Sequence, residues 1–436
     1  MTRNRIITAI DVGTDKCVTL IASIEEPKNS LRVMGVSAVH SRGMKRSQII
    51  DLEKVLETIT ESLDGAERMA GVEVKSAFIS ISGTHISSQN SKGVVAVASP
   101  NKEINPDDVE RVIEAARAIS LSSEKEIIHV IPKDFKVDSQ EGIKDPIGMT
   151  GVRLESEAHI ITGLSTALKN MEKCILDLGV QVDGFIFSGL ASASVVLSET
   201  EKELGVAVID IGAGSTSVCV YVDGSLEYSA SLPVGARHIT QDIALGCKVS
   251  LDSAEKIKIA LSKEAFKPLA PIAGESKQDF NRRKEKADKL KLSDFDQTTD
   301  TTESFSKKDI VEKIMLPRVQ EIFSLVGERL RSENLFPLIP AGVVITGGGA
   351  QTTKIAEIAK RELNLSARIG KPIELQGLTS DITKPEFATS IGLLFLGKKQ
   401  DGAGTVDTLN FGAVFKNVSF GSMPKKIAGF FKSLLP

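Results

Sequence analysis

The sequence predicts an α/β protein of two related lobes that face each other across a cleft. Two segments, Ile6–Ile21 and Val206–Val222, follow one pattern: an apolar strand reaches an aspartate, a glycine comes two residues later, and a polar turn leads into a returning strand. The chain of 436 residues is also longer than one hydrophobic core usually supports. A repeated hairpin in a chain of this length therefore indicates two lobes, each of them subdivided.

Both hairpin turns carry groups that suit a phosphate and a divalent cation. Glycines let backbone N–H groups approach an anion closely, and hydroxyl and ammonium groups add donors. One such hairpin is as often a plain turn, but two that face each other would grip a polyphosphate from both sides. Asp11 and Asp210, at the strand ends, would each offer a carboxylate to one Mg²⁺ ion. The predicted phosphate-binding residues are Gly13, Thr14, Asp15 and Lys16 in the first turn, and Gly212, Ala213, Gly214, Ser215 and Thr216 in the second.

Lobe one continues with alternating strand and helix patterns. Asp51–Ala70 places apolar residues at helical spacing, and Asp51 is a suitable N-cap. The other expected elements of this lobe are strands at Leu31–His40, Val74–Ser82 and Gln181–Ser188, and helices at Ser165–Asp177 and Leu190–Leu204.

Residues 84–162 interrupt lobe one and predict a compact α+β unit. A strand near Gly93–Ala98 precedes a helix that starts at Asn105 and Pro106, where proline suits the first helical position. Short extended runs follow at Ile127–Ile131 and Asp134–Val137. This unit shows no catalytic constellation, so an interaction module is a better interpretation than an active centre.

Lobe two ends in a glycine-rich segment. A strand, Gly342–Ile345, runs into Gly347, Gly348 and Gly349, and a surface without side chains suits a purine and its ribose. The polar stretch Glu275–Lys308 predicts a partly disordered loop with no assigned function. Helices are expected at Gly235–Gly246, Leu251–Leu261, Ile310–Leu330, Ile355–Leu363 and Ala388–Leu396.

The two hairpins and the glycine segment, in this order and at these separations, resemble the phosphate-1, phosphate-2 and adenosine motifs of the actin-like ATPase superfamily. Within it, the chain resembles the FtsA family of bacterial cell-division proteins over nearly its whole length. The segments that carry this resemblance are Phe78–Asn90, Glu157–Gly163, Gly179–Gly205 and Pro385–Leu394. The resemblance implies an actin-like two-lobed fold that binds ATP with Mg²⁺. It also places Gly235, Glu255 and Lys258 at the nucleotide, the last two at the ribose and purine, with an ordinary exposed ion pair as the alternative for that pair.

The same resemblance implies a division into subdomains and a set of partners. Residues 1–83 and 163–204 would form subdomain 1A, 84–162 the inserted 1C, 205–236 and 336–396 subdomain 2A, and 237–335 subdomain 2B. The tubulin-like FtsZ would bind 2B, other division proteins would bind 1C, and further copies of the chain would form filaments. The expected location is the cytoplasmic face of the cell membrane at the division site.

The last forty residues change character. Residues 397–421 are rich in glycine and polar residues and predict a flexible linker. Residues 422–436 then predict a short basic amphipathic helix, a pattern typical of an interfacial anchor on an anionic membrane rather than of a helix docked on the protein itself. The residues assigned to the membrane are Lys425, Lys426, Ile427, Phe430, Phe431, Leu434 and Leu435.

Hydrolysis needs a group that orients the attacking water. Hydrolytic relatives such as the rod-shape protein MreB carry an acid at the start of the helix after the lobe-one strand, where this chain has Phe187-Ser188-Gly189-Leu190. We therefore expect at most a slow ATPase. Two other functions stay open: a scaffold like the pilus protein PilM, against which the terminal helix argues, and a small-molecule kinase, for which no catalytic aspartate is convincing.

Composition excludes several other classes of protein. The net charge of −3 and the absence of tryptophan argue against nucleic acid as a partner. The cysteines are scattered singly, which predicts neither disulfides nor a zinc site and suits a reducing cytosol. The polar start Met1–Arg5 does not suit a signal peptide, and no apolar run reaches the roughly 18 residues of a spanning helix.

Overall fold

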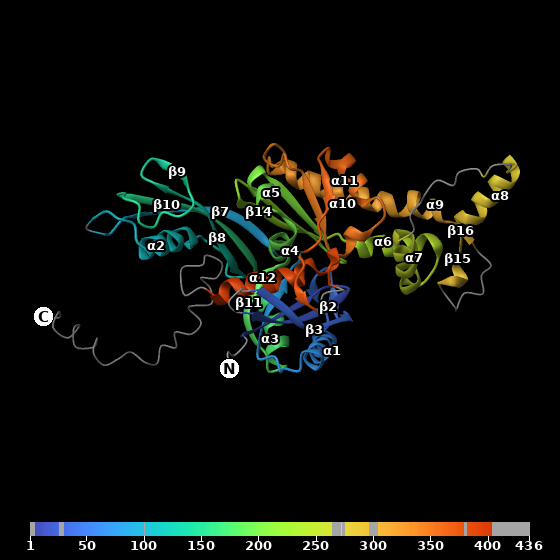
Figure 1. Ribbon diagram of the computed structural model, residues 1–436, viewed down its shortest axis with the longest axis horizontal. Coiled ribbons are helices and arrows are strands. Elements are labelled where there is room, and N and C mark those ends of the chain that lie inside the picture. Colours follow the sequence, from blue (N-terminus) through green and yellow to red (C-terminus); the bar gives the residue numbers. More distant parts are fainter. Residues whose placement is uncertain are drawn as a thin grey trace.

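The structure is a computed structural model that describes residues 5–25, 30–99, 101–263, 272, 275–295, 304–378 and 382–402. Its centre consists of two mixed β-sheets with helices between them and on their outer faces (Figure 1). The first sheet has the strand order β11-β6-β1-β2-β3-β19. Its strands are β1 (Arg5–Val12), β2 (Lys16–Glu25), β3 (Ser30–His40), β6 (Ser76–Ile81), β11 (Gln181–Phe187) and β19 (Gln376–Gly377).

The second sheet repeats this arrangement in the order β14-β13-β12-β17-β18. In each sheet three consecutive antiparallel strands are followed by two parallel ones, so β12 takes the place of β1 and β17 that of β6. The duplicated order confirms the predicted two-lobed α/β fold. The strands are β12 (Val206–Ile211), β13 (Thr216–Val222), β14 (Ser225–Leu232), β17 (Val343–Thr346) and β18 (Ala367–Ile369).

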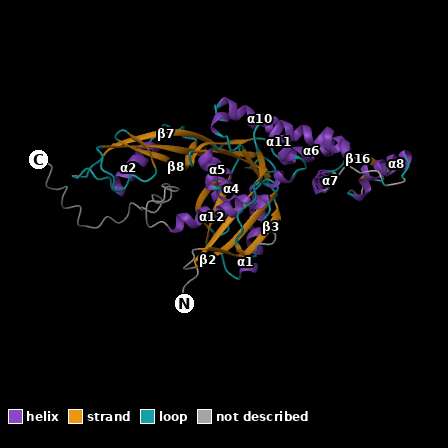
Figure 2. Cartoon of the chain, turned by 45° about the horizontal axis from the view of Figure 1, so that its top comes forward, coloured by secondary structure: helices purple, strands orange, loops and turns teal. Residues whose placement is uncertain are grey.

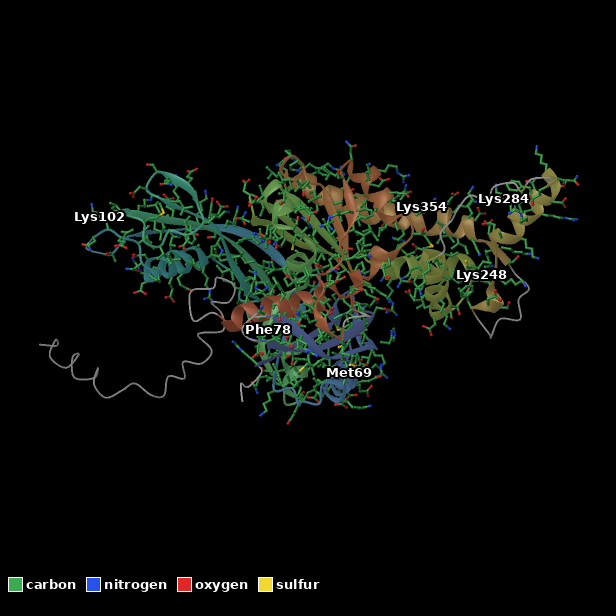
Figure 3. The ribbon with its side chains drawn as sticks, in the orientation of Figure 1. Met69, Phe78, Lys102, Lys248, Lys284 and Lys354 are labelled. Carbon is green, nitrogen blue, oxygen red and sulfur yellow. The ribbon has the colours of Figure 1, made fainter. Side chains whose placement is uncertain are left out.

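Two helices, α4 (Ser188–Val196) and α12 (Ala388–Gly402), lie between the sheets and join the lobes (Figure 2). Helix α12 packs on β1, β2 and β6 of the first sheet, whereas α4 contacts β6 and β11 of the first sheet and β12, β13 and β17 of the second. Phe78, labelled in Figure 3, lies under α12 so closely that a side chain at Gly397 would overlap its ring. A Cβ at Gly392 would likewise overlap the carbonyl oxygen of Ala191. This close crossing lets one hydrophobic core run through both lobes.

The outer face of each sheet is covered by its own helices. Asp51 caps the first of them, accepting from the Lys54 N–H as predicted. Each set of helices buries its apolar residues in a separate core against its sheet. The covering helices are α1 (Leu52–Ala70) and α3 (Ser165–Leu176) on the first sheet, and α6 (Ala236–Cys247), α10 (Leu316–Ser332) and α11 (Ile355–Leu363) on the second. Helix α7 (Leu251–Lys263) packs on α6.

The insertion forms a separate four-stranded sheet of order β7-β10-β8-β9, with α2 packed on it and a core of its own (Figure 1). Asn105 and Asp108 form a capping box, with Pro106 at the first helical position as predicted. The first strand begins at Ser87, earlier than the predicted Gly93. The two short runs predicted at Ile127–Ile131 and Asp134–Val137 belong to one continuous strand. The elements are β7 (Ser87–Ala96), α2 (Pro106–Arg117), β8 (Lys125–Val137), β9 (Gln140–Ile143) and β10 (Arg153–Leu164).

The prediction of one helix over Leu190–Leu204 was wrong. The chain leaves the helical conformation at Leu197, and Ser198 caps a new helix, α5 (Glu199–Leu204), by accepting from the Glu201 N–H. The long helix predicted from Ile310 begins as a π-helix, Ile310–Met315, before α10.

The polar stretch Glu275–Lys308 contains more structure than predicted. Helix α8 (Lys277–Asp288) carries Lys284, far from the lobe centres in Figure 3. It is followed by a small hairpin of β15 (Lys289–Lys291) and β16 (Ser304–Ser306), in which Leu290 is buried in the lobe-two core and Phe305 packs against it. A few apolar residues within the polar stretch thus order these parts of it.

The first residues of the predicted linker, 397–402, are helical, because α12 extends through Gly402. Residues 403–436, which include the predicted membrane helix, lie outside the described residues. Among the residues that are described, no helix is long and apolar enough to cross a bilayer.

Candidate functional site

A cavity of about 500 Å³ lies between the lobes, where β1 and β12 end. This size is in the range of pockets for nucleotide-sized ligands. Most of the predicted site residues come together here: Asp11, Gly13, Thr14, Asp15, Lys16, Asp210, Gly212, Ala213, Ser215, Glu255, Lys258, Gly347, Gly348 and Gly349 all line it.

The two hairpin turns have the same geometry. The Gly13 N–H donates to the Lys16 carbonyl at 3.0 Å, and the Gly212 N–H donates to the Ser215 carbonyl at 2.9 Å. The flanking residues pair in the same register, Val12 with Cys17 in the first hairpin and Ile211 with Thr216 in the second. Lys16 and Ser215 are therefore equivalent positions, one with an ammonium group and the other with a hydroxyl.

The two strand-end aspartates are both poorly solvated. Asp11 Oδ1 accepts from Ser80 Oγ at 2.7 Å, and Asp210 Oδ2 accepts from Thr389 Oγ1 at 3.1 Å. Burial raises the pKa of Asp11. Burial also raises the pKa of Asp210 to about 6, and the negative charge of Asp11 adds to this shift. Two carboxylates that disfavour each other's charge would be stabilised by a cation between them.

This pair fits Mg²⁺ better than a transition metal. No cluster of three or more His, Cys, Asp or Glu suited to a metal occurs in the part of the chain that the structure describes. Mg²⁺ is commonly held by one or two carboxylates, with phosphate oxygens and water completing its shell. The donor set formed by Asp11 and Asp210 is of this kind.

Serine hydroxyls that the sequence analysis missed connect the lobes at the cavity. Ser47, in the turn between β4 (Met44–Lys45) and β5 (Gln48–Ile49), bonds to Ser215 Oγ at 2.8 Å. Its N–H donates to Thr14 Oγ1 at 2.9 Å. Ser82 Oγ lies 3.3 Å from Ser215 Oγ and from Ser217 Oγ, and Ser188 Oγ lies 3.3 Å from Ser217 Oγ. Ser80 and Ser82, which alternate with isoleucines at the end of a buried strand, were a signal in the sequence.

Three residues that were predicted to bind the nucleotide shape the second turn instead of lining the cavity. The Thr216 hydroxyl donates to the Val234 carbonyl at 2.7 Å in the buried interior, so its predicted role as a phosphate donor was wrong. Gly214 leaves room for Thr14 and Arg46, because a Cβ there would lie 2.5 Å from Thr14 Oγ1. Gly235 allows α6 to dock on the turn, since its Cβ would lie 2.5 Å from the Gly212 carbonyl.

The three glycines after β17 have different neighbours. A side chain at Gly347 would overlap Asp210 Oδ1, and one at Gly349 would overlap Ile211. Gly347 also has a φ of 83°, a region that disfavours other residues. A Cβ at Gly348 would meet only Glu386 Cβ, at 3.9 Å. Only Gly348 therefore lacks a packing reason to be glycine, which leaves it as the residue open to a ligand.

The Glu255–Lys258 pair is not an ordinary surface ion pair. Lys258 Nζ lies 2.7 Å from Glu255 Oε2 and donates to Thr240 Oγ1 at 3.0 Å. The Lys258 side chain is only 12% exposed, and both residues form a wall of the cavity.

The ionisable groups of the cavity balance in sign. Its lining contains five carboxylates and five cationic groups. The carboxylates are Asp11, Asp15, Asp210, Glu255 and Glu386, and the cations are Lys16, Arg237, Lys258, Lys263 and Lys384. A polyphosphate that arrives with a divalent cation matches such a lining better than a bare polyanion does.

Comparison with known proteins agrees with this fold. The family model for "Cell division protein FtsA" matches residues 207–392, and that for the "SHS2 domain inserted in FTSA" matches residues 83–162. FtsA of Pseudomonas aeruginosa is 35% identical over 400 residues, 91% of each chain. FtsA of Borreliella burgdorferi is 36% identical over 408 residues, 92% of each chain.

Solved structures with the same fold are more distant in sequence. The PilM-PilN type IV pilus biogenesis complex matches with a TM-score of 0.58 and 16% identity, covering 90% of this chain and 98% of that one. MreB5 of Spiroplasma citri bound to ADP matches with a TM-score of 0.50 and 13% identity, covering 91% and 97%. The duplicated sheets and the interlobe cavity thus define a protein of the actin-like class. Within that class, the chain belongs to the FtsA family of bacterial cell-division proteins.

Proposed function

We propose that the interlobe cavity binds Mg-ATP and that the chain serves cell division as a nucleotide-dependent, membrane-tethered adaptor. The observation that carries the nucleotide proposal is the pair of matched turns whose strand-end aspartates face one cavity. The same fold in MreB5 holds ADP, which supports a nucleotide here. Membership of a cell-division family supports the setting.

Each wall of the cavity has a role in this proposal. Asp11 and Asp210 would hold Mg²⁺, which supplies charge neutralisation between the phosphates. The N–H groups of the two turns, together with Lys16 and Ser215, would contact phosphate oxygens. Gly348 and the partly exposed Ile259 would flank the base, and Glu255 with Lys258 would contact the ribose and purine.

Hydrolysis is proposed to be slow. Ser188, at the start of α4, lines the cavity at the place where hydrolytic relatives carry an acid, and its hydroxyl is a weaker base than a carboxylate. A turnover well below the roughly 1–100 s⁻¹ of kinases is expected. The protein would then use ATP mainly to set its conformation and assembly.

The adaptor role combines surfaces outside the cavity. Residues 237–335 would bind FtsZ, the insertion at 84–162 would recruit later division proteins, and stacked copies would form filaments. Residues 422–436 would bind the anionic cytoplasmic face of the membrane at the division site. A PilM-like scaffold or a small-molecule kinase has less support, because the likeness to the PilM complex extends to the fold alone and the FtsA relatives match about nine-tenths of the chain.

Calorimetry tests the nucleotide proposal. Mg-ATP is expected to bind the full chain, and Asp11→Ala combined with Asp210→Ala is expected to weaken binding on the order of 100-fold or more, because two charge-assisted contacts to the ion are lost. Asp64→Ala, at an exposed aspartate on α1, is the matched control. Electron microscopy on a lipid monolayer, with and without ATP, would report assembly. Absence of heat with Mg-ATP, and assembly unchanged in the double variant, would refute the proposal.

A further inference from the structure

The segment from Lys384 to Thr389, just before and within the start of α12, contacts all three ligand loops. Glu386 bonds to Lys16 of the first turn, and Thr389 donates to Asp210 beside the second. The Pro385 carbonyl accepts from the Gly347 N–H at 3.2 Å. No sequence pattern pointed to a role for this segment in the site, although it contacts both hairpins and the glycine segment.

The Lys384–Thr389 segment supplies Lys16 with two contacts inside the protein. Its Nζ lies 3.1 Å from Glu386 Oε2 and 3.9 Å from the centre of the Phe387 ring. Both charged side chains are about one-quarter exposed, so their attraction is screened less than that of a surface pair. The ammonium that would contact a phosphate therefore already has an anionic partner.

A phosphate oxygen and the Glu386 carboxylate would compete for the same ammonium. If Lys16 turned fully to phosphate, the Lys16–Glu386 pair would be lost. If Lys16 held both, two anions would lie close together in a partly desolvated cavity, which is also unfavourable. In either case the negative charge of Glu386 opposes the binding of a phosphate chain.

We propose that Glu386 sets the affinity and phosphate selectivity of the cavity by acting as the competing partner of Lys16. The inference rests on the proposed nucleotide function. Removal of the Glu386 charge then frees Lys16 and tightens binding in proportion to the charge of the phosphate chain. A ligand without phosphate gains nothing.

The test is a double-mutant cycle of the full chain, using Glu386→Gln, Lys16→Met and the double variant. Calorimetry with Mg-ATP, Mg-ADP and adenosine supplies the affinities. Glu386→Gln keeps the size of the side chain and is expected to tighten Mg-ATP binding on the order of tenfold, Mg-ADP binding less, and adenosine binding not at all. In the Lys16→Met background the same change is expected to gain much less. Glu357→Gln, at an exposed carboxylate on α11, controls for net charge.

The outcomes separate the two proposals. If the wild-type chain binds no Mg-ATP, the nucleotide function and this inference fail together. If the wild type binds but Glu386→Gln binds Mg-ATP equally or more weakly, this inference alone fails, because Glu386 would then be neutral or a direct ligand contact. An equal gain for adenosine, or an equal gain without Lys16, would also refute it. Melting temperatures of all variants, measured without ligand, would establish that every affinity is measured on a folded protein.

Discussion

At the scale of single residues, side chains of the same or similar type occupy their positions for different physical reasons. Gly347 is required by its positive φ and by the nearby Asp210 carboxylate, whereas Gly348 has open space beside it. Thr216 and Ser215 are neighbours with hydroxyls, yet one faces the core and the other the cavity. Only the neighbours that each side chain meets decide which of them is available to a ligand.

Alanine at the two glycines should separate folding from binding. Gly347→Ala is expected to lower the melting temperature by several degrees, because a strained φ and overlap with Asp210 cost on the order of 1–3 kcal/mol or more. Gly348→Ala should leave the melting temperature within about one degree of wild type and change only nucleotide affinity. Thermal unfolding followed by circular dichroism would check this, and equal effects of the two variants would contradict the assignment.

At the scale of elements, the insertion is bonded to lobe two although it is spliced into lobe one. Its strands β7, β8 and β10 contact β14, the edge strand of the second sheet. His159 bonds to Ser229 Oγ at 3.0 Å and to Asn90 Oδ1 at 2.7 Å, while Asn90 Nδ2 donates to Glu227. Lys133 lies 2.5 Å from Glu227 Oε2. These polar contacts between the insertion and β14, which we call the seam, also cover a sheet edge that would otherwise present unpaired backbone groups.

The seam should weaken in acid because of His159. Burial lowers the pKa of His159 from 6.5 to about 3, so the folded chain holds it neutral while the unfolded chain protonates it near pH 6.5. The unfolded state thus binds more protons between these values, and stability falls as the pH drops through this window, by at most about 1.4 kcal/mol per unit. His159→Gln should lower stability at pH 7.5 but flatten the decline towards pH 5.

Melting temperatures at a series of pH values would measure this slope. His40→Gln, at an exposed histidine on β3, serves as the control and should retain the wild-type slope. A wild-type decline that persists unchanged in His159→Gln would show that other groups cause it.

At the scale of the whole molecule, the lobes are joined by two helices that lie between the sheets. Helix α4 contacts β6 and β11 of the first sheet and β12, β13 and β17 of the second, whereas α12 contacts β1, β2 and β6 of the first. Any change in the angle between the lobes would therefore involve the α4–α12 crossing, next to the segment that contacts all three ligand loops. The same helix, α12, leads into the tail that we propose to bind membrane.

The proposed membrane anchor should be weak alone and firm in a filament. Each large apolar side chain contributes at most about 1.5–3 kcal/mol on full burial, and each lysine about 1 kcal/mol near anionic lipid. Many copies on one filament raise the effective concentration and strengthen binding. In liposome co-sedimentation, the full chain is expected to pellet with anionic vesicles, and Phe430→Glu with Phe431→Glu is expected to stay largely in the supernatant. Equal pelleting of both proteins would refute the membrane proposal.

The sequence alone determined the parts of the fold that depend on neighbouring residues. Both aspartate–glycine hairpins, the capped helix α1, the helix of the insertion and the glycine loop follow from strand alternation, helical spacing and turn chemistry within a few positions. The repetition of one local pattern was also enough to predict two lobes. Local patterns failed where a cap or a few apolar contacts overrode them, as at Ser198 and in the hairpin of β15 and β16.

Only the tertiary structure decided which side chains complete the cavity. Ser47 meets Ser215 across 168 positions of sequence, and Lys16 meets Glu386 across 370. The attachment of the insertion to β14 also depends on residues far apart in the sequence, such as His159 and Ser229, which are 70 positions apart. The physical reason is that hydrogen bonds and ion pairs depend on distances of about 3 Å in space, and the packing of whole elements sets those distances.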